Sequence, residues 1–178
     1  MTTVVVLATG SRFWDDVWSI KHELDRAVAE AVAAGADEFV LRHGACYPPY
    51  VKGTRRRPHR SADWLAHLWF ERFGAAQPIS IIEQARPADW EGPCRPACNQ
   101  ATHRGRNINH RRTRGTTMIC PMAGHHRNRD MVLEDPRPNY GIAFQRDNST
   151  GTGNCIKTMR EFSIPVREVP YRPQGEKS

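Results

Sequence analysis

The sequence predicts an α/β fold in which helices cover both faces of a mainly parallel sheet. Short apolar runs rich in β-branched residues recur along the chain, amphipathic segments of helical period separate them, and small polar loops follow several of the runs. Strands that alternate with helices in this way form parallel sheets through right-handed crossovers. A length of 178 residues with 39% hydrophobic content suits a single domain. We therefore expect a Rossmann-like three-layer sandwich.

Five apolar runs are the expected strands. They are 3–8, 39–41, 79–82, 141–144 and 166–169. The connecting helices are expected after Asp16, from Ser61 to Phe73, from His125 and after Thr152. Ser61 can cap its helix through the hydroxyl, and Gly35 is expected to end the first helix. The domain is expected to span 1–172, with an insert at 86–123 and a flexible tail at 173–178.

Three loops of small residues follow expected strands, at 10–14, 43–46 and 148–152. The carboxyl ends of parallel strands meet at one edge of a sheet, which is where such folds bind ligands. In the third loop, glycine and hydroxyl residues precede a helix, so backbone N–H groups and the positive helix end can approach an anion. The sequence therefore predicts a phosphate cradle at this edge.

Several side chains are expected to contact the ligand there. Arg12 can bind phosphate through its planar guanidinium, and Arg127 stands at a helix start beside the cradle. Trp14 either stacks on a base or fills the core, and His43 either contacts the ligand or has a structural role. The expected ligand-binding residues are Gly10, Ser11, Arg12, Trp14, His43, Gly44, Arg127, Asn128, Ser149, Thr150, Gly151 and Thr152.

The insert, 86–123, shows neither helical nor strand period, and it is too long for a structureless loop in a compact domain. It contains Cys94, Cys98, His103 and Cys120. Three thiolates and one imidazole suit a tetrahedral Zn²⁺, and four protein ligands leave no open position for water. We therefore predict a structural zinc site, with His110 as a rival fourth ligand and free thiols as the alternative.

Composition narrows the class of protein further. The 26 Lys and Arg against 19 Asp and Glu give a formal charge of +7, concentrated at 52–60 and 104–114. Such basic loops suit an anionic ligand or nucleic acid, or they have no specific role. The apolar run at 3–8 is too short to span a bilayer and lacks the features of a signal peptide. Five cysteines in unequal contexts argue against a disulfide framework, so we expect a cytoplasmic protein without membrane contact.

Five motifs, in this order and spacing, resemble the SLOG superfamily, in particular its small stand-alone branch in actinobacteria and their phages. They are Gly-Ser-Arg-Phe-Trp at 10–14, His-Gly-Ala-Cys at 43–46, Arg-Asn-Arg-Asp-Met at 127–131, Ser-Thr-Gly-Thr at 149–152 and Ser-Ile-Pro-Val at 163–166. The resemblance implies a Rossmann-like fold that binds a nucleotide or a nucleotide-derived ligand, as a sensor or as an enzyme. Relatives often self-associate, so a homo-oligomer is also implied.

The chain also resembles the lonely-guy-type phosphoribohydrolases, a branch that releases the base from a nucleoside monophosphate. Arg127 falls near the catalytic arginine of that branch, and Gly151 and Thr152 match its phosphate loop. The resemblance thus implies, as an alternative function, a nucleotide N-glycosidase. A nucleic-acid-binding module that uses the basic loops is a second alternative.

The chain departs from the phosphoribohydrolase motif in two places. Asn148-Ser149 replaces its double glycine, and 153–155 carries no glutamate where that motif ends in one. Because an oxocarbenium-like centre needs a carboxylate, another acidic residue would have to replace it. Asp130, Asp89 and Glu91 are the candidates, and Arg127 with Asp130 forms the expected catalytic pair.

Overall fold

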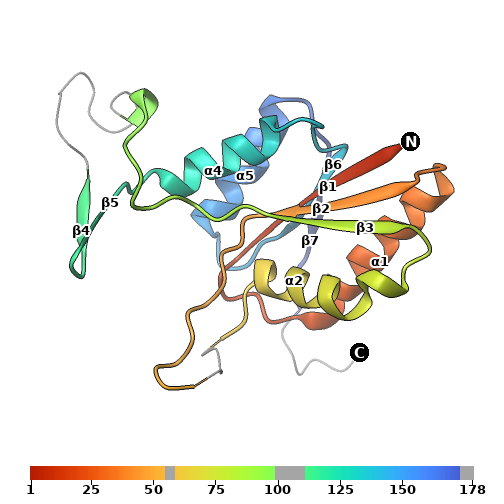
Figure 1. Cartoon of the computed structure of the whole chain (residues 1–178), viewed down its shortest axis with the longest axis horizontal. Coiled ribbons are helices and arrows are strands. Elements are labelled where there is room, and N and C mark those ends of the chain that lie inside the picture. The colour runs from red at the N-terminus through yellow and green to blue at the C-terminus, as the bar shows by residue number, and fades with distance from the viewer. Residues whose placement is uncertain (55–58, 99–110, 173–178) are drawn as a thin grey trace.

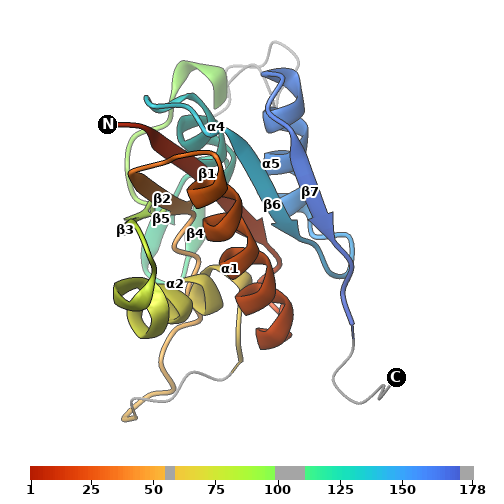
Figure 2. The same ribbon diagram turned by 90° about the vertical axis from the view of Figure 1, so that its right-hand side faces the viewer.

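A computed structural model describes residues 1–54, 59–98 and 111–172. Its centre is a five-stranded sheet in the order β3-β2-β1-β6-β7, in which every neighbouring pair is parallel. The strands are β1 (Thr3–Gly10), β2 (Glu38–His43), β3 (Ser80–Ala85), β6 (Tyr140–Phe144) and β7 (Val166–Val169). Strand β1 lies in the middle, with β3 and β7 at the two edges (Figure 2). The predicted α/β class and the five expected strands are therefore confirmed.

Helices cover both faces of this sheet. They are α1 (Val17–Ala33), α2 (Ala62–Phe73), α4 (Ala123–Leu133) and α5 (Thr150–Glu161), with a 3-10 turn, η1 (Gly74–Ala76), after α2. Figure 1 shows α1 and α2 on one side of the sheet and α4 and α5 on the other. In the part of the chain that the structure describes, no helix has the length and apolarity needed to cross a membrane.

Two apolar cores hold the three layers together. On one face, Val6 and Ala8 of β1 pack with residues of α1 and α2 such as Leu24 and Leu65. On the other face, Leu7 packs with residues of α4 and α5. Successive side chains of a strand point to opposite faces, so β1 contributes to both cores and is buried on both sides. The predicted three-layer sandwich is confirmed.

The ends of the first two helices agree with the sequence prediction. Asp16 caps α1 by accepting a hydrogen bond from the N–H of Ser19 (3.0 Å), and Ser61 caps α2 by accepting one from Trp64 (3.2 Å). Gly35 follows α1 with φ of 75°, a left-handed conformation that favours glycine. These ends determine where the loops at the carboxyl edge of the sheet return to the helices.

The insert differs from the sequence expectation, because it contains a small antiparallel hairpin. Strand β4 (Arg112–Arg114) pairs with β5 (Thr117–Ile119), away from the main sheet (Figure 1). Three-residue strands are too short for an alternating pattern to be recognised. Helix α4 also begins earlier than predicted, at Ala123 rather than His125. The predicted tail, 173–178, lies outside the described residues, and the extent of the domain stays a prediction.

Arg42 of β2 fastens the carboxyl end of α4 to the sheet. Its side chain is fully buried, and its guanidinium donates to the carbonyls of Met131 (2.8 Å), Glu134 (3.1 Å) and Pro136 (3.2 Å). Burial lowers the pKa of Arg42, while the nearby Glu134 carboxylate acts in the opposite direction. The last carbonyls of a helix lack internal partners, and Arg42 satisfies that of Met131 together with two carbonyls of the segment that follows α4.

Candidate functional site

A cavity of about 630 Å³ opens at the carboxyl edge of the sheet. Its walls come from the loops after β1, β2 and β6 and from the first turns of α2, α4 and α5. This is the edge where parallel α/β sheets bind ligands, and the volume falls within the range of small-molecule sites, about 300 to 1,000 Å³. The three loops of small residues in the sequence thus meet in one cavity.

The amino end of α5 faces this cavity without a side-chain cap. Ser149 is the N-cap residue, but its hydroxyl accepts from the hydroxyl of Thr152 (3.0 Å) and not from a backbone N–H. Ser149, Thr150, Gly151 and Thr152 all line the cavity. A Cβ at Gly151 would meet no atom within 4 Å, so the backbone there is open. Uncapped N–H groups together with the helix dipole favour an anion at this point.

The loop before α5 is shaped by its own backbone and by Ser11. Asp147 and Asn148 both have positive φ, 55° and 47°. Asp and Asn tolerate this conformation better than most residues. The hydroxyl of Ser11 donates to the carbonyl of Arg146 (2.8 Å) and accepts from its N–H (2.7 Å). Ser11 therefore lines the cavity, but its hydroxyl joins the β1 and β6 loops to each other.

Arg127 extends from α4 across the cavity wall. Its guanidinium donates to the carbonyls of Gly44 and Arg86, the latter at 3.2 Å, and its Nε donates to the Asn128 side chain at 3.0 Å. A Cβ at Gly44 would collide with this guanidinium, so glycine is needed at that position. All of these acceptors are uncharged, and Arg127 forms no ion pair within the described ranges. The positive charge is thus held in place without a protein counter-charge.

Asn128 fastens α4 to α5 at the cavity. It is almost fully buried, and its Nδ2 donates to the carbonyl of Gly151 (3.0 Å) and to the side chain of Asn154 (3.1 Å). Its side-chain oxygen accepts from Arg127. The predicted ligand residue thus uses its amide within the protein, where it orients Arg127 and the first turn of α5.

The Cys46 thiol lies close to one carboxylate and two guanidinium groups in the lining of the cavity. Asp63, in the first turn of α2, accepts a hydrogen bond from the N–H of Cys46 (2.8 Å). Burial raises the pKa of the Cys46 thiol, and the charge of Asp63 adds to this effect, whereas Arg12 and Arg127 lower it. A thiol with a raised pKa is a poor nucleophile at neutral pH. Cys46 is therefore a wall residue, and Arg12 lies beside it.

Trp14 does not reach the cavity, which corrects its place among the expected ligand residues. The side chain is fully buried, and the indole N–H donates to the carbonyl of Asp16 at 3.0 Å. Its ring packs edge-on against Phe144 and Tyr171, with centroids 5.4 and 5.2 Å away. Two adjacent aromatic residues leave the turn in opposite directions, and the sequence does not show which of them points inward.

His43 also has a structural place. It is fully buried, its Nε2 lies 2.8 Å from the Glu83 carboxylate, and its Nδ1 accepts from the N–H of Ala45 (3.2 Å). An Nδ1 that accepts a hydrogen bond leaves Nε2 as the donor to Glu83. His43 does not line the cavity, and its imidazole holds the turn that carries Gly44, which is the structural role that the sequence left open. Gly10 does line the cavity, but a Cβ there would collide with Ala62, so it serves close packing.

Two aromatic side chains that the sequence did not single out line the cavity. Phe13 is 58% exposed, and its ring lies 4.8 Å from that of His59. Trp90 comes from the insert, and its ring lies 3.4 Å from where a Cβ at Gly124 would be. Local sequence carries no signal for Trp90, because its place depends on how the insert folds back over α4.

The expected catalytic carboxylate, Asp130, does not line this cavity. It pairs with Arg95, whose Nη1 donates at 2.7 Å, and it borders a separate cavity of about 260 Å³. Asp89 borders that second cavity as well and accepts from the N–H of Gly92 (2.8 Å). Neither Asp130 nor Asp89 lines the larger cavity, so neither stands where the missing glutamate would be needed. The carboxylates in the larger cavity are Asp63 and Asp147.

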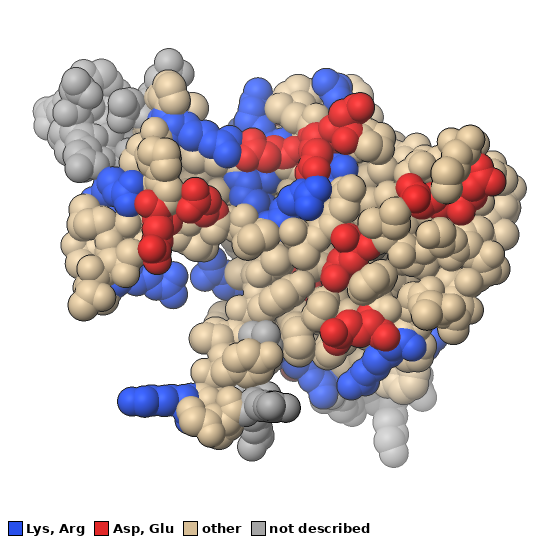
Figure 3. Space-filling model, in the orientation of Figure 1, with Lys and Arg blue, Asp and Glu red and all other residues tan. Residues whose placement is uncertain are grey.

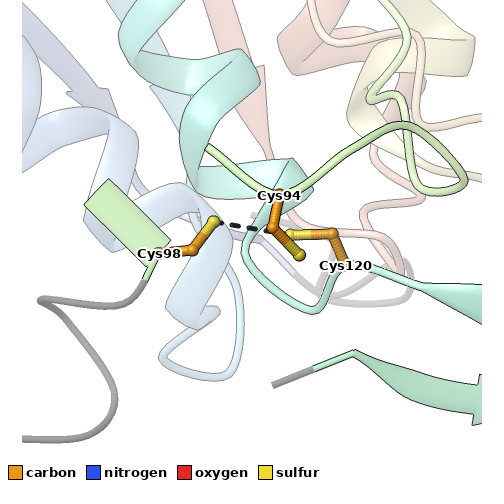
Figure 4. A group of neighbouring side chains, drawn as sticks. All are labelled: Cys94, Cys98 and Cys120. Atoms are coloured by element: carbon orange, nitrogen blue, oxygen red, sulfur yellow. Dashed lines mark hydrogen bonds between the residues drawn. The ribbon is translucent and has the colours of Figure 1, made fainter. Parts of the chain in front are cut away.

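Three cysteines of the insert meet beside α4. The sulfur atoms of Cys94, Cys98 and Cys120 all lie within 4.8 Å of one another, with Cys98 and Cys120 at 3.7 Å (Figure 4). Tetrahedral Zn²⁺ with Zn–S bonds of about 2.3 Å requires sulfur atoms about 3.8 Å apart. Burial raises the pKa of both Cys94 and Cys98. The cluster has the geometry of a metal site, and the predicted fourth ligand, His103, lies outside the described residues, as does its rival His110.

His126 of α4 lies beside this cluster. Its Nε2 lies 2.8 Å from the sulfur of Cys98. Ligand spacing within the insert alone does not reveal it, because His126 belongs to the helix that follows the insert. The sequence signal for it is the adjacent pair His125-His126. Neighbouring residues of a helix point in different directions, so one of the two can face the cluster while the other faces the cavity.

The cysteine cluster and the cavity share the first turn of α4. Cys98, Cys120 and Ala123 form a small buried cluster with Trp90 packed against it. The N–H of Cys120 donates to the carbonyl of Trp90 (2.8 Å), and the N–H of Ala123 donates to the carbonyl of Cys120 (3.1 Å). Trp90 also lines the ligand cavity, as do several residues of that turn. The cysteine cluster and the cavity at the carboxyl edge of the sheet are thus neighbours.

The fold and this cavity define a Rossmann-like α/β protein with a cavity at the carboxyl edge of its sheet and a cysteine cluster in an insert. Comparison of the chain with models of protein families, with curated proteins and with solved structures finds no match. Function therefore has to be argued from the chemistry of the site, because a Rossmann-like fold alone serves many functions.

Proposed function

We propose that this protein binds a nucleotide or a nucleotide-derived ligand in the cavity at the carboxyl edge of the sheet. The observation that supports this most is the uncapped amino end of α5, which faces the same cavity as Arg127, a cation whose acceptors are all uncharged. A phosphate group satisfies both, because it accepts from helix N–H groups and pairs with a guanidinium. The resemblance to the SLOG superfamily points to the same ligand class.

The remaining walls suit the rest of a nucleotide. Phe13 and Trp90 offer aromatic faces on which a base can stack, a contact that contributes about 1 to 3 kcal/mol per base. Arg12 adds a second guanidinium beside Cys46. The ligand thus lies with its phosphate at α5 and its base against one of the aromatic rings.

Calorimetric titration with inorganic phosphate and a panel of nucleotides tests this proposal. Arg127→Met is expected to weaken binding by about tenfold or more, since a charge-assisted contact contributes about 1.5 to 3 kcal/mol. Arg129→Met is the matched control, because Arg129 lies two positions further along α4, over the ring of Phe162. Equal effects of the two substitutions, or no binding of any anion, would contradict the proposal.

The same panel separates binding from catalysis. Chromatography of each incubated nucleotide shows whether free base is released, as the N-glycosidase alternative requires. That alternative has lost its expected carboxylate, since Asp130 borders the other cavity. An intact ligand supports a binding or sensing role, and released base supports the enzyme.

No specific observation favours the nucleic-acid alternative. Both basic runs extend beyond the described residues, and on the face shown in Figure 3 basic and acidic side chains alternate over the insert and the sheet. A nucleic-acid-binding module would show affinity that falls steeply with salt and is unaffected by free nucleotide.

We also propose that the cysteine cluster holds Zn²⁺ as a structural ion. Three thiolates of suitable spacing favour zinc over oxygen-preferring cations, and a histidine completes four ligands. Native mass spectrometry is expected to show one zinc per chain, and Cys98→Ser is expected to lose it. Cys46→Ser is the control, because Cys46 lies in the ligand cavity and not in the cluster. A folded chain that binds nucleotide and is purified without metal would contradict this assignment.

A further inference from the structure

Asp63 is an almost fully buried carboxylate in the wall of the ligand cavity. It is 5% exposed, and one of its oxygens, Oδ2, accepts from the N–H of Cys46 at 2.8 Å. Within 1–54, 59–98 and 111–172, its other oxygen has no hydrogen-bond partner, and the carboxylate forms no ion pair. A buried carboxylate without donors is costly, so this oxygen calls for a donor from the ligand.

The donor that suits Asp63 is neither a phosphate nor a cation of the protein. A phosphate would be repelled by the carboxylate. Arg12 and Arg127 both act on the thiol of Cys46, as Asp63 does, yet neither is within ion-pair distance of Asp63. In the described part of the chain, Asp63 therefore keeps one oxygen without a partner although two guanidinium groups lie near the same thiol, and Asp147 is the other carboxylate of the cavity lining. A neutral hydroxyl group is a donor that suits this oxygen of Asp63.

Asp63 belongs to α2 and contacts the loop after β2, and the order of the strands sets how far that loop lies from the phosphate cradle. Strand β1 lies between β2 and β6, so the loop that contacts Asp63 and the loop that leads into α5 are separated by two strand spacings. Two spacings amount to about 10 Å between the two loops, and the side chains of each loop extend into this interval. In a nucleotide the group next to the phosphate is the sugar, which brings its hydroxyls into this interval.

We propose that Asp63 accepts hydrogen bonds from the vicinal hydroxyls of a ribose, so that the ligand class is a 5′-phosphorylated ribonucleoside or a derivative of one. The inference rests on the proposed function, in which phosphate binds at α5. A ligand without the 2′-hydroxyl leaves the buried oxygen unsatisfied, and sites built to bind a hydroxyl reject analogues that lack it. Asp63 thus selects the sugar, while α5 and Arg127 bind the phosphate.

The test uses calorimetry with three probes, namely inorganic phosphate, ribose 5-phosphate and 2-deoxyribose 5-phosphate. The wild-type protein is expected to bind the ribose compound about tenfold or more tightly than the deoxy compound. In Asp63→Asn this ratio is expected to approach one, while inorganic phosphate is expected to bind at least as tightly as in the wild-type protein, because a repelling charge is removed. The ratio in the wild-type protein needs no variant, so a misfolded Asp63→Asn would not prevent the test.

The outcomes separate this inference from the function on which it rests. If none of the three probes binds, the proposed function itself fails. If phosphate binds and the two sugar phosphates bind equally, only the role of Asp63 fails. The role also fails if Asp63→Asn changes discrimination between bases in the nucleotide panel while the sugar ratio stays, because the carboxylate would then contact the base.

Discussion

The ligand cavity and the cysteine insert lie side by side, but different forces hold them. The cavity is formed by the ends of regular strands and helices, which two large apolar cores position. The described part of the insert has one short hairpin, a helical segment at 96–98 and a buried cluster of three residues, Cys98, Cys120 and Ala123. So small an apolar cluster cannot compensate the conformational entropy of a long segment. Hydrophobic burial organises the first region, and side-chain ligands are needed to organise the second.

The two regions meet at the first turn of α4. Cys120 and His126 connect this turn to the cysteine cluster, while Arg127 leaves it towards the cavity. The insert therefore contributes one wall of the cavity, and the other walls come from the loops after the strands and from the first turns of the helices. Substitutions and metal removal can show how far the regions are independent.

Metal removal is expected to have the largest effect, because zinc binding to small structural sites contributes about 10 kcal/mol or more. A chelator is expected to expose 86–123 to limited proteolysis while the far-UV circular dichroism of the sheet and its helices stays largely unchanged. Affinity for nucleotide is expected to fall as well, because the turn that carries Arg127 loses its support. Proteolysis and affinity that do not change on chelation would show that apolar contacts hold the insert.

Two histidine variants sharpen this prediction by identifying the imidazole at the site. A site with three thiolates takes one imidazole, so only one of the two variants is expected to lower zinc affinity. A loss in His126→Ala is expected to lower nucleotide affinity as well, because its Nε2 lies 2.8 Å from the sulfur of Cys98 and it precedes Arg127. A loss in His103→Ala alone would identify His103 as the ligand. Competition with a chromophoric chelator measures both.

Arg42→Met tests the sheet side of α4 and is expected to have the next largest effect. It removes the donor to the buried carbonyl of Met131 and to the part-buried carbonyls of Glu134 and Pro136. A loss of about 3 kcal/mol or more in the free energy of unfolding is expected. Urea unfolding measures it, with the exposed Arg26→Met as control, for which a change below about 0.5 kcal/mol is expected. A small loss in both variants would show that packing alone fixes α4.

Two glycine variants separate stability from binding within the cavity. Gly44→Ala is expected to displace the guanidinium of Arg127 and to weaken phosphate binding about tenfold, a change of about 1.4 kcal/mol. Gly151→Ala meets no atom within 4 Å, so its stability is expected to stay within about 0.5 kcal/mol of wild type. Its methyl group enters the open side of the cradle and is expected to weaken phosphate binding. Thermal unfolding and calorimetry give the two quantities, and unchanged binding in Gly151→Ala would place the phosphate elsewhere.

The smallest expected effect is a pH dependence at the other end of α4. The pKa of Glu134 is lowered chiefly by its hydrogen bonds with Arg86. A carboxyl with a lowered folded pKa contributes stability above its unfolded pKa of about 4.3, and this contribution is lost as the pH falls through the folded value. Solvent screening of this partly exposed pair keeps it below about 1 kcal/mol. Glu134→Gln is therefore expected to reduce stability more at pH 7 than in acid, and equal losses at both would contradict the assignment.

Local sequence was sufficient for the frame of the protein. Buried parallel strands are continuous apolar runs and helices keep a 3.6-residue period, so all five strands and the caps at Asp16, Ser61 and Gly35 could be predicted. Glycine and hydroxyl residues before a helix pointed to the cradle at α5. Cysteine spacing pointed to the cluster, because thiols gathered in a segment without period suggest a metal.

Tertiary structure decided which side chains enter the cavity. Trp14 packs inward and Phe13 outward, Asp130 borders a different cavity, and Asp63 lines the one that matters here. Periodicity describes a residue relative to its own element, whereas a cavity is formed by elements far apart in the chain. Trp90 belongs to the insert yet shares a wall with the sheet for the same reason. The sequence by itself thus determined the layers and the edge at which the loops of small residues meet, and only the packing of helices across that edge determined which side chains line the cavity there.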